Sequence, residues 1–183
     1  MISLQARLSA GLILALATLT ILAVAIGGYS LRRIAENFVA ARLEHDLETL
    51  LAALDFDADG RPQLATDRID TTFHQPYSGH YYQIETSSGK LCSRSLWDAD
   101  LALPPLAADR TIRAFVTGPQ DRRLLLVGRT FRIQNQQNQQ NQQNQQNQQN
   151  QQVTIAVTED FTPVDAGLRR LLLEFGLVAL TLF

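Results

Sequence analysis

The sequence is poor in cysteine, lysine and net charge. Its 183 residues include one cysteine, Cys92, and one lysine, Lys90, and the formal charge is −2 at pH 7. A single cysteine excludes an internal disulfide and a zinc site built from several cysteines. The small negative charge provides no basic surface for a nucleic acid, so we expect no nucleic-acid partner. The length suits one ordinary domain, or a smaller domain with membrane segments.

The mean hydropathy of −0.08 is typical of a water-soluble protein, but one segment lowers it. Residues 134–152 consist of thirteen Gln and six Asn in a strict three-residue period. Without this tract the mean hydropathy of the chain rises to roughly +0.3, which is typical of membrane proteins. The period matches neither a helix nor a strand, and a tract without apolar side chains cannot form a core. We interpret it as an expanded hairpin loop rather than as an amide-rich aggregation or adhesion element.

The amino-terminal part contains a run of 24 uncharged residues between Arg7 and Arg32. As a helix this run covers about 36 Å, enough to cross a hydrocarbon core of about 30 Å. A cleaved signal peptide would have a shorter apolar region and a small-x-small cleavage site, which residues 29–33 do not provide. The sequence therefore predicts a cytoplasmic tail over residues 1–7 and an uncleaved transmembrane helix over residues 8–31.

Beyond this span, apolar residues at helical spacing predict that residues 32–54 continue as a helix. The predicted apolar stripe consists of Val39, Leu43, Leu47, Leu50 and Leu54. Such a stripe can pack on a sheet of its own domain, contact a second copy of the chain, or do both. We predict a homodimer that forms through this helix and the membrane helices.

The segment Asp55–Gly60 has acidic residues at its first, third and fifth positions and glycine at its sixth, as at the start of a calcium-binding loop. The pattern requires a bidentate Glu at position 12, where this chain has Thr66, and Pro62 interrupts it. Asp and Gly are equally frequent in tight surface turns. We favour the turn and predict no metal site.

Further along the chain, apolar residues alternate with polar ones, as is typical of strands. The runs that predict strands are His80–Glu85, Leu91–Leu96, Ile112–Val116, Leu124–Ile133 and Val153–Thr158. Short turns separate most of these runs, and a helix precedes all of them. The pattern predicts an α+β fold on an antiparallel sheet of about five strands.

The last segment begins with the helix-start signals of Thr162–Asp165. It leads into the uncharged run Phe175–Phe183, which is too short to cross a membrane. We interpret residues 163–183 as a helix that enters an incomplete second transmembrane helix, and we expect a truncation at Phe183. Residues 32–162 then form an extracytoplasmic domain between the two membrane segments.

Three strings of residues in this order carry a family resemblance: His74–Ile84 (HQPYSGHYYQI), Ser93–Leu101 (SRSLWD and a following Leu) and Val153–Asp160 before the last helix. Together they resemble the amino-terminal sensor region of bacterial two-component sensor histidine kinases. The resemblance implies a PAS- or PDC-like sheet that senses an unknown periplasmic ligand. It also implies that the chain is located in the bacterial inner membrane, with its amino terminus in the cytoplasm and residues 32–170 in the periplasm.

In that family the second span leads to a HAMP linker, a phospho-accepting histidine and an ATP-binding domain. The histidines of this chain, His45, His74 and His80, all precede the last helix, and its glycines form no nucleotide-binding loop. We therefore expect no catalytic residue, no phospho-acceptor and no cofactor here. The resemblance implies ATP and Mg²⁺ only for the kinase core, which this chain lacks. It implies a response regulator as partner only for a full-length kinase.

The candidate ligand-binding residues are His80, Tyr82, Arg94 and Trp97. Arg94 stands between two serines on a predicted strand and can bind an anionic group through two parallel hydrogen bonds. In the alternative interpretation Tyr82 and Trp97 fill the core or its rim, while Arg94 pairs with Asp98 or Asp100. A pH or metal sensor built on His74 and His80 lacks further ligands, and Cys92 is expected to be a buried free thiol.

Two other functions remain open at this point. The domain can be the sensor module of another transmembrane receptor, such as a chemoreceptor or a cyclase, or a stand-alone membrane-tethered binding module. Residues beyond Phe183 distinguish these functions, because a HAMP segment and a phospho-accepting histidine would follow in a histidine kinase.

Overall fold

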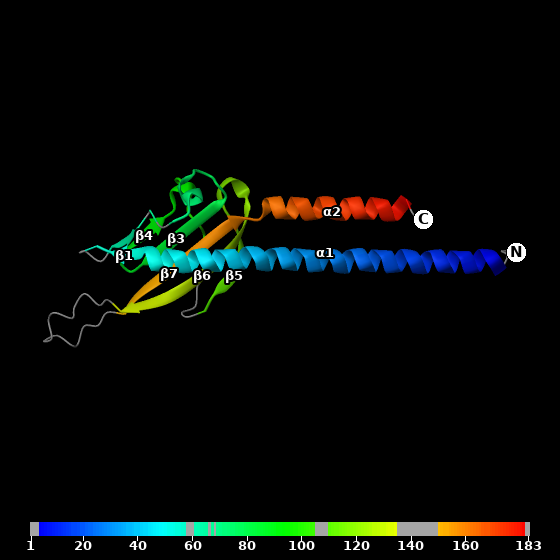
Figure 1. The fold of residues 1–183 in the computed structure, drawn as a ribbon, viewed down its shortest axis with the longest axis horizontal. Helices are drawn as coiled ribbons and strands as arrows, with labels where there is room; N and C mark the ends of the chain where they lie inside the picture. The colour runs from blue at the N-terminus through cyan, green and yellow to red at the C-terminus, as the bar shows by residue number, and fades with distance from the viewer. Residues whose placement is uncertain are drawn as a thin grey trace. The chain divides into compact units, whose positions relative to one another are not determined.

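A computed structural model of the chain describes residues 4–57, 61–65, 67, 69–104, 110–134 and 150–181 (Figure 1). The chain divides into two units, of which one runs from Phe38 to Phe161 and the other contains the segments before and after it. The elements are α1 (Leu4–Ala53), β1 (Leu54–Phe56), β2 (Pro62–Leu64), η2 (Thr71–His74), β3 (His80–Thr86), β4 (Gly89–Cys92), η3 (Arg94–Leu96), β5 (Ile112–Thr117), η4 (Pro119–Asp121), β6 (Arg123–Gln134), β7 (Asn150–Asp160) and α2 (Thr162–Thr181), where η marks a 3₁₀ helix.

The first unit contains the amino-terminal part of α1 and the helix α2. Among the described residues, α1 is the helix that is long and apolar enough to cross a membrane, judged by length and composition. The two helices contact each other through an ion pair between Arg32 and Asp165 at 3.7 Å. A Cβ atom at Gly28 would lie 2.7 Å from a methyl carbon of Leu172, so this glycine permits their close approach.

The helix α1 continues without interruption into the second unit, which confirms the predicted long helix beyond the apolar segment. Four residues of the predicted stripe are buried there, namely Val39, Leu43, Leu47 and Leu50. The fifth, Leu54, is not helical, because it begins β1 and pairs with Leu64 of β2. The hydrogen bond from Ala65 N to Ala53 O, at 3.1 Å, joins this hairpin to the end of the helix.

The acidic residues Asp55 and Asp57 lie in β1 and directly after it. The Asp57 carboxylate accepts a hydrogen bond from Arg61 N at 2.8 Å, and Asp55 accepts one from Phe56 N at 2.8 Å. Residues 58–60 of the considered calcium loop lie outside the described residues. Within the part of the chain that the structure describes, no group of three or more His, Cys, Asp or Glu side chains is arranged to hold a metal ion.

A five-stranded antiparallel sheet forms the centre of the second unit, with strand order β4-β3-β7-β6-β5. This arrangement confirms the predicted α+β fold. The β6–β7 pairing extends from Leu124 opposite Asp160 to Gln134 opposite Asn150. The two ends of the Gln/Asn tract therefore belong to the sheet, and residues 135–149 lie outside the described residues.

The predicted strand Leu91–Leu96 is wrong in its second half, because β4 ends at Cys92 and the 3₁₀ helix η3 follows. Two serine side chains explain the change. Ser93 Oγ accepts a hydrogen bond from Tyr82 N at 3.1 Å, and Ser95 Oγ donates one to the His80 carbonyl at 2.6 Å. These bonds to the backbone of β3 replace the regular pairing between strands.

The two faces of the sheet have different coverings. The face that carries Tyr82, Ile84 and Val157 packs against α1, whose Arg42 and Glu44 form ion pairs with Glu159 of β7 and Arg113 of β5. We call it the helix face, and Figure 1 shows α1 crossing it. The opposite face, called the cover face, carries Tyr81, Gln83, Leu124, Leu126, Thr130 and Thr158. Residues 93–104, called the cover segment, pack on it through Leu96 and Leu101.

Candidate functional site

Buried polar side chains gather between the cover face and the cover segment. They are Gln83, Thr130 and Thr158 on the strands and Ser93 and Ser95 in the segment. Burying a polar group costs free energy unless a hydrogen bond compensates for it. A concentration of such groups on one side of the sheet makes this side the candidate functional site, whereas the helix face is mainly apolar.

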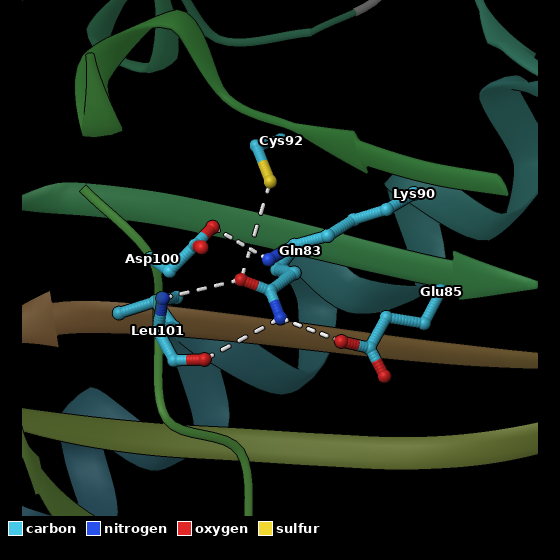
Figure 2. A network of polar contacts seen from close by, with 6 residues as sticks. All are labelled: Gln83, Glu85, Lys90, Cys92, Asp100 and Leu101. Carbon is cyan, nitrogen blue, oxygen red and sulfur yellow. Dashed lines mark hydrogen bonds and ion pairs between the residues drawn. The ribbon is translucent and has the colours of Figure 1, made fainter. Parts of the chain in front are cut away.

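The amide of Gln83 is the centre of this site (Figure 2). Its Oε1 accepts a hydrogen bond from Leu101 N at 3.2 Å, and its Nε2 donates to Leu101 O at 3.4 Å. The Nε2 also donates to Glu85 Oε1 at 2.8 Å, and the Cys92 thiol lies 4.0 Å from Oε1. One side chain thus bonds both backbone groups of Leu101, as a neighbouring strand would, and holds the cover segment on the sheet.

An ion pair lies beside this network, at the edge of the sheet. Lys90 Nζ is 2.6 Å from Asp100 Oδ1, and both side chains are exposed to solvent. The hydrogen bond to Asp100 raises the pKa of Lys90. An exposed pair of this kind adds little to stability, so Gln83 and the serines provide the stronger attachment.

Tyr81 is the largest side chain that is fully buried on the cover face. It packs with Leu96, Leu101 and Leu124. Burial raises the pKa of its hydroxyl, and the backbone of Gly79 beside it lowers that pKa. The sequence analysis did not select Tyr81 or Gln83, although the alternation in residues 80–85 places both on one face of a strand.

His80 and Tyr82, two of the four predicted ligand-binding residues, lie on the helix face of β3. The rings of Phe73 and Tyr82 are 5.3 Å apart in an edge-to-face arrangement, and those of Phe73 and His80 are 6.5 Å apart. Tyr82 is buried, and burial raises its pKa. Tyr82 therefore fills the core, as in the alternative interpretation of the sequence.

Arg94 and Trp97, the other two, are exposed in and directly after η3. Arg94 is not on a strand, and its side chain forms no ion pair within the described residues; Asp100, a predicted partner, binds Lys90 instead. Trp97 is 61% exposed and has φ 57° and ψ −112°, a backbone conformation that is unfavourable for a side chain of this size. The four predicted residues thus lie in two places, His80 and Tyr82 on β3 and Arg94 and Trp97 at η3. Among the described contacts, no side-chain hydrogen bond, ion pair or ring contact joins the first two residues to the other two.

An antiparallel sheet with a helix on one face and a polar, covered opposite face defines an α+β domain. Over 162 residues the chain is 30% identical to Sensor protein kinase CarS of Pseudomonas aeruginosa, a match that covers 88% of this chain and 32% of that protein. This similarity supports the resemblance drawn from the motifs, to the sensor region of a sensor histidine kinase. The chain spans about a third of the length of this relative. No protein-family model and no solved structure matches the chain.

Replacing Gln83 by leucine is expected to destabilise the domain. The substitution leaves the buried backbone groups of Leu101 without their partner, which costs about 1–3 kcal/mol of unfolding free energy. Urea unfolding followed by the fluorescence of Trp97, the single tryptophan, measures the change. Lys90→Met is the matched control and should change the free energy by less than about 0.5 kcal/mol. Equal effects of the two substitutions would contradict the role given to Gln83.

The thiol of Cys92 is expected to react slowly near neutral pH. Burial raises its pKa, so a smaller fraction is thiolate at a given pH than in the unfolded chain. The rate of reaction with Ellman's reagent increases with pH as the thiolate forms. We expect this increase to begin at a higher pH in the folded chain than in the same chain unfolded in urea. Identical pH profiles for the two states would show that the thiol is not protected by the fold.

Proposed function

We propose that this chain is the extracytoplasmic, membrane-anchored sensing part of a two-component sensor histidine kinase. The observation that supports it is the similarity to a sensor protein kinase over 88% of the chain. This similarity favours a kinase over a chemoreceptor, a cyclase or a stand-alone binding module. In the proposal the catalytic core, with its ATP and Mg²⁺, lies outside this chain, and a response regulator is the partner of the whole kinase.

A sensor works when its ligand binds one conformation better than another. Of the four residues selected from the sequence, Arg94 and Trp97 are exposed and accessible to a ligand in the periplasm. We propose that they contact it first, with the guanidinium binding an anionic group and the indole an apolar one. His80 and Tyr82 then support the same turn from β3, because Ser95 bonds the His80 carbonyl.

The proposed orientation places the amino terminus in the cytoplasm and residues 32–170 in the periplasm. Cysteine labelling in intact cells tests it in a Cys92→Ser background. Ser87→Cys, at an exposed site on the β3–β4 turn, should react with a membrane-impermeant maleimide without permeabilisation. Gln5→Cys, also exposed, should react only after the inner membrane is permeabilised. The reverse pattern, or labelling of both sites in intact cells, would contradict this orientation.

We also propose a homodimer, in which α1 contacts a second copy through the side that faces away from its own sheet. Leu43 and Leu50 of the predicted stripe are covered by the sheet and are not available to a partner. On the opposite side Ile34 and Phe38 are 64% and 71% exposed. Exposed Ala41 and His45 continue this side at spacings of three and four residues, as in a coiled-coil seam.

Disulfide cross-linking in native membranes tests this arrangement. In the Cys92→Ser background, Phe38→Cys should give a covalent dimer under mild oxidation, because parallel coiled-coil seams bring equivalent residues together. Leu43→Cys lies on the same helix at a similar depth and is the control, which should remain monomeric. Cross-linking of Leu43→Cys alone, or equally of both variants, would contradict the proposed interface.

A further inference from the structure

Charged and titratable side chains gather where α1 packs on the start of β3 and the end of β7. They come from four parts of the second unit and are Arg42, His45 and Asp46 of α1, Asp70 before η2, His80 of β3 and Glu159 of β7. We call them the α1 cluster. The cluster lies on the helix face of the sheet, whereas Gln83 and the cover segment lie on the opposite face, so it is separate from the candidate site.

Glu159 contributes a buried carboxylate to this cluster. Its side chain is 13% exposed, and Oε1 forms an ion pair with Arg42 of α1. The second oxygen, Oε2, is buried and has no hydrogen-bond partner among the described residues. A buried charged oxygen without a donor costs free energy, so a second donor at this carboxylate would be favourable.

His80 lies directly opposite Glu159 in the sheet. The two residues are partners in the β3–β7 register, and both side chains are on the helix face. In the next pair along the strands, Asp160 N donates to Gly79 O at 2.8 Å, which makes His80 and Glu159 a pair without backbone hydrogen bonds between them. In such pairs the Cα atoms are about 4.5 Å apart and the side chains approach most closely. The imidazole can therefore reach the carboxylate by rotation of its side chain.

The other charges that act around His80 are mainly negative. On α1, burial raises the pKa of Asp46, whereas Arg42 and His80 lower it, and His45 lowers it further. Before η2, a hydrogen bond from the backbone of that helix lowers the pKa of Asp70, and His80 lowers it as well. Each of these interactions is reciprocal, so both aspartates favour the protonated form of His80. Besides its two histidines, the cluster contains three carboxylates and one guanidinium, and so it lacks positive charge.

We propose that His80 is a proton switch that controls how firmly the sheet holds α1. In the neutral state Arg42 pairs with one oxygen of Glu159. When His80 binds a proton, the imidazolium donates a hydrogen bond to Glu159 and attracts Asp46, so that one charge attaches both β7 and α1. Histidine is suited to this role because its charge changes between about pH 5 and 8. The use of the switch as a signal rests on the proposed sensing function, but proton binding itself does not.

Histidine-selective NMR of the full 183-residue chain in lipid nanodiscs tests the proton site. The chain has three histidines, so His45→Gln and His74→Gln identify the His80 signal by elimination. In Glu159→Gln the midpoint of the His80 titration should move to lower pH by about half a unit or more, because a nearby negative charge is lost. Asp46→Asn should move it in the same direction. Asp160→Asn, which removes the adjacent carboxylate on the cover face, is the matched control and should leave the midpoint in place.

Thermal stability at two pH values tests the effect on the fold. A group that gains partners when it is protonated in the folded chain stabilises the fold at acid pH, and this contribution is lost as the pH rises. His80→Gln should therefore lower the melting temperature by about 2–4 °C more at about pH 5.5 than at about pH 8. This extra loss should shrink in a Glu159→Gln background, because the main partner is gone. His74→Gln should show no such pH dependence.

Two results would each overturn the switch. One is a His80 titration that neither Glu159→Gln nor Asp46→Asn moves, and the other is a loss of stability in His80→Gln that is equal at both pH values. If Glu159→Gln does not fold, Asp46→Asn takes its place in both experiments. These outcomes do not depend on the cysteine labelling, which tests the proposed orientation by itself.

Discussion

The pairing of β7 with both β3 and β6 is the constraint on which the rest of this structure depends. The strand is central in the sheet, and its register decides which side chains face α1 and which face the cover segment. A slip by one residue would turn Val157 toward the cover segment and Thr158 toward α1. The same slip would reverse Glu159 and Asp160, whose partners Arg42 and Arg122 lie on opposite sides of the sheet. The register is therefore fixed by apolar burial and by charge together.

The two coverings of the sheet are attached by different kinds of interaction. The helix α1 is held by a stripe of buried aliphatic side chains, each of which contributes about 1.5–3 kcal/mol when it is removed from water. The cover segment is held by the buried side chains of Leu96 and Leu101 and also by directional bonds from Gln83, Ser93 and Ser95, each worth about 0.5–1.5 kcal/mol net.

The periodic parts of the fold could be predicted from the sequence, because periodicity reports which side of an element is buried. The stripe on α1 and the alternation in β3, β5, β6 and β7 are examples. The errors come from local contacts that periodicity does not encode. Leu54 continues the helical spacing but pairs with Leu64, and Leu91–Leu96 has strand-forming residues but is interrupted by the side-chain bonds of Ser93 and Ser95.

The candidate site was harder to predict than the fold. Chemical character selected Arg94 and Trp97, which are exposed, and Tyr82, which is a core residue. Gln83 was missed because its importance depends on its bonds to Leu101, and Tyr81 because its importance depends on its packing against Leu96, Leu101 and Leu124. The alternation in residues 80–85 places these two side chains on one face, but it does not reveal these contacts with distant residues.

Both helices are connected to adjacent residues at the end of one strand. Glu159 binds Arg42 of α1, and one of its carboxylate oxygens, Oε2, is buried without a hydrogen-bond partner in the described part of the chain. Asp160 and Phe161 are held by backbone bonds to Gly79 and Arg123, and α2 follows directly in the chain. Because Glu159 and Asp160 are adjacent, a change at this end of β7 would affect Arg42 of α1 and the start of α2 together.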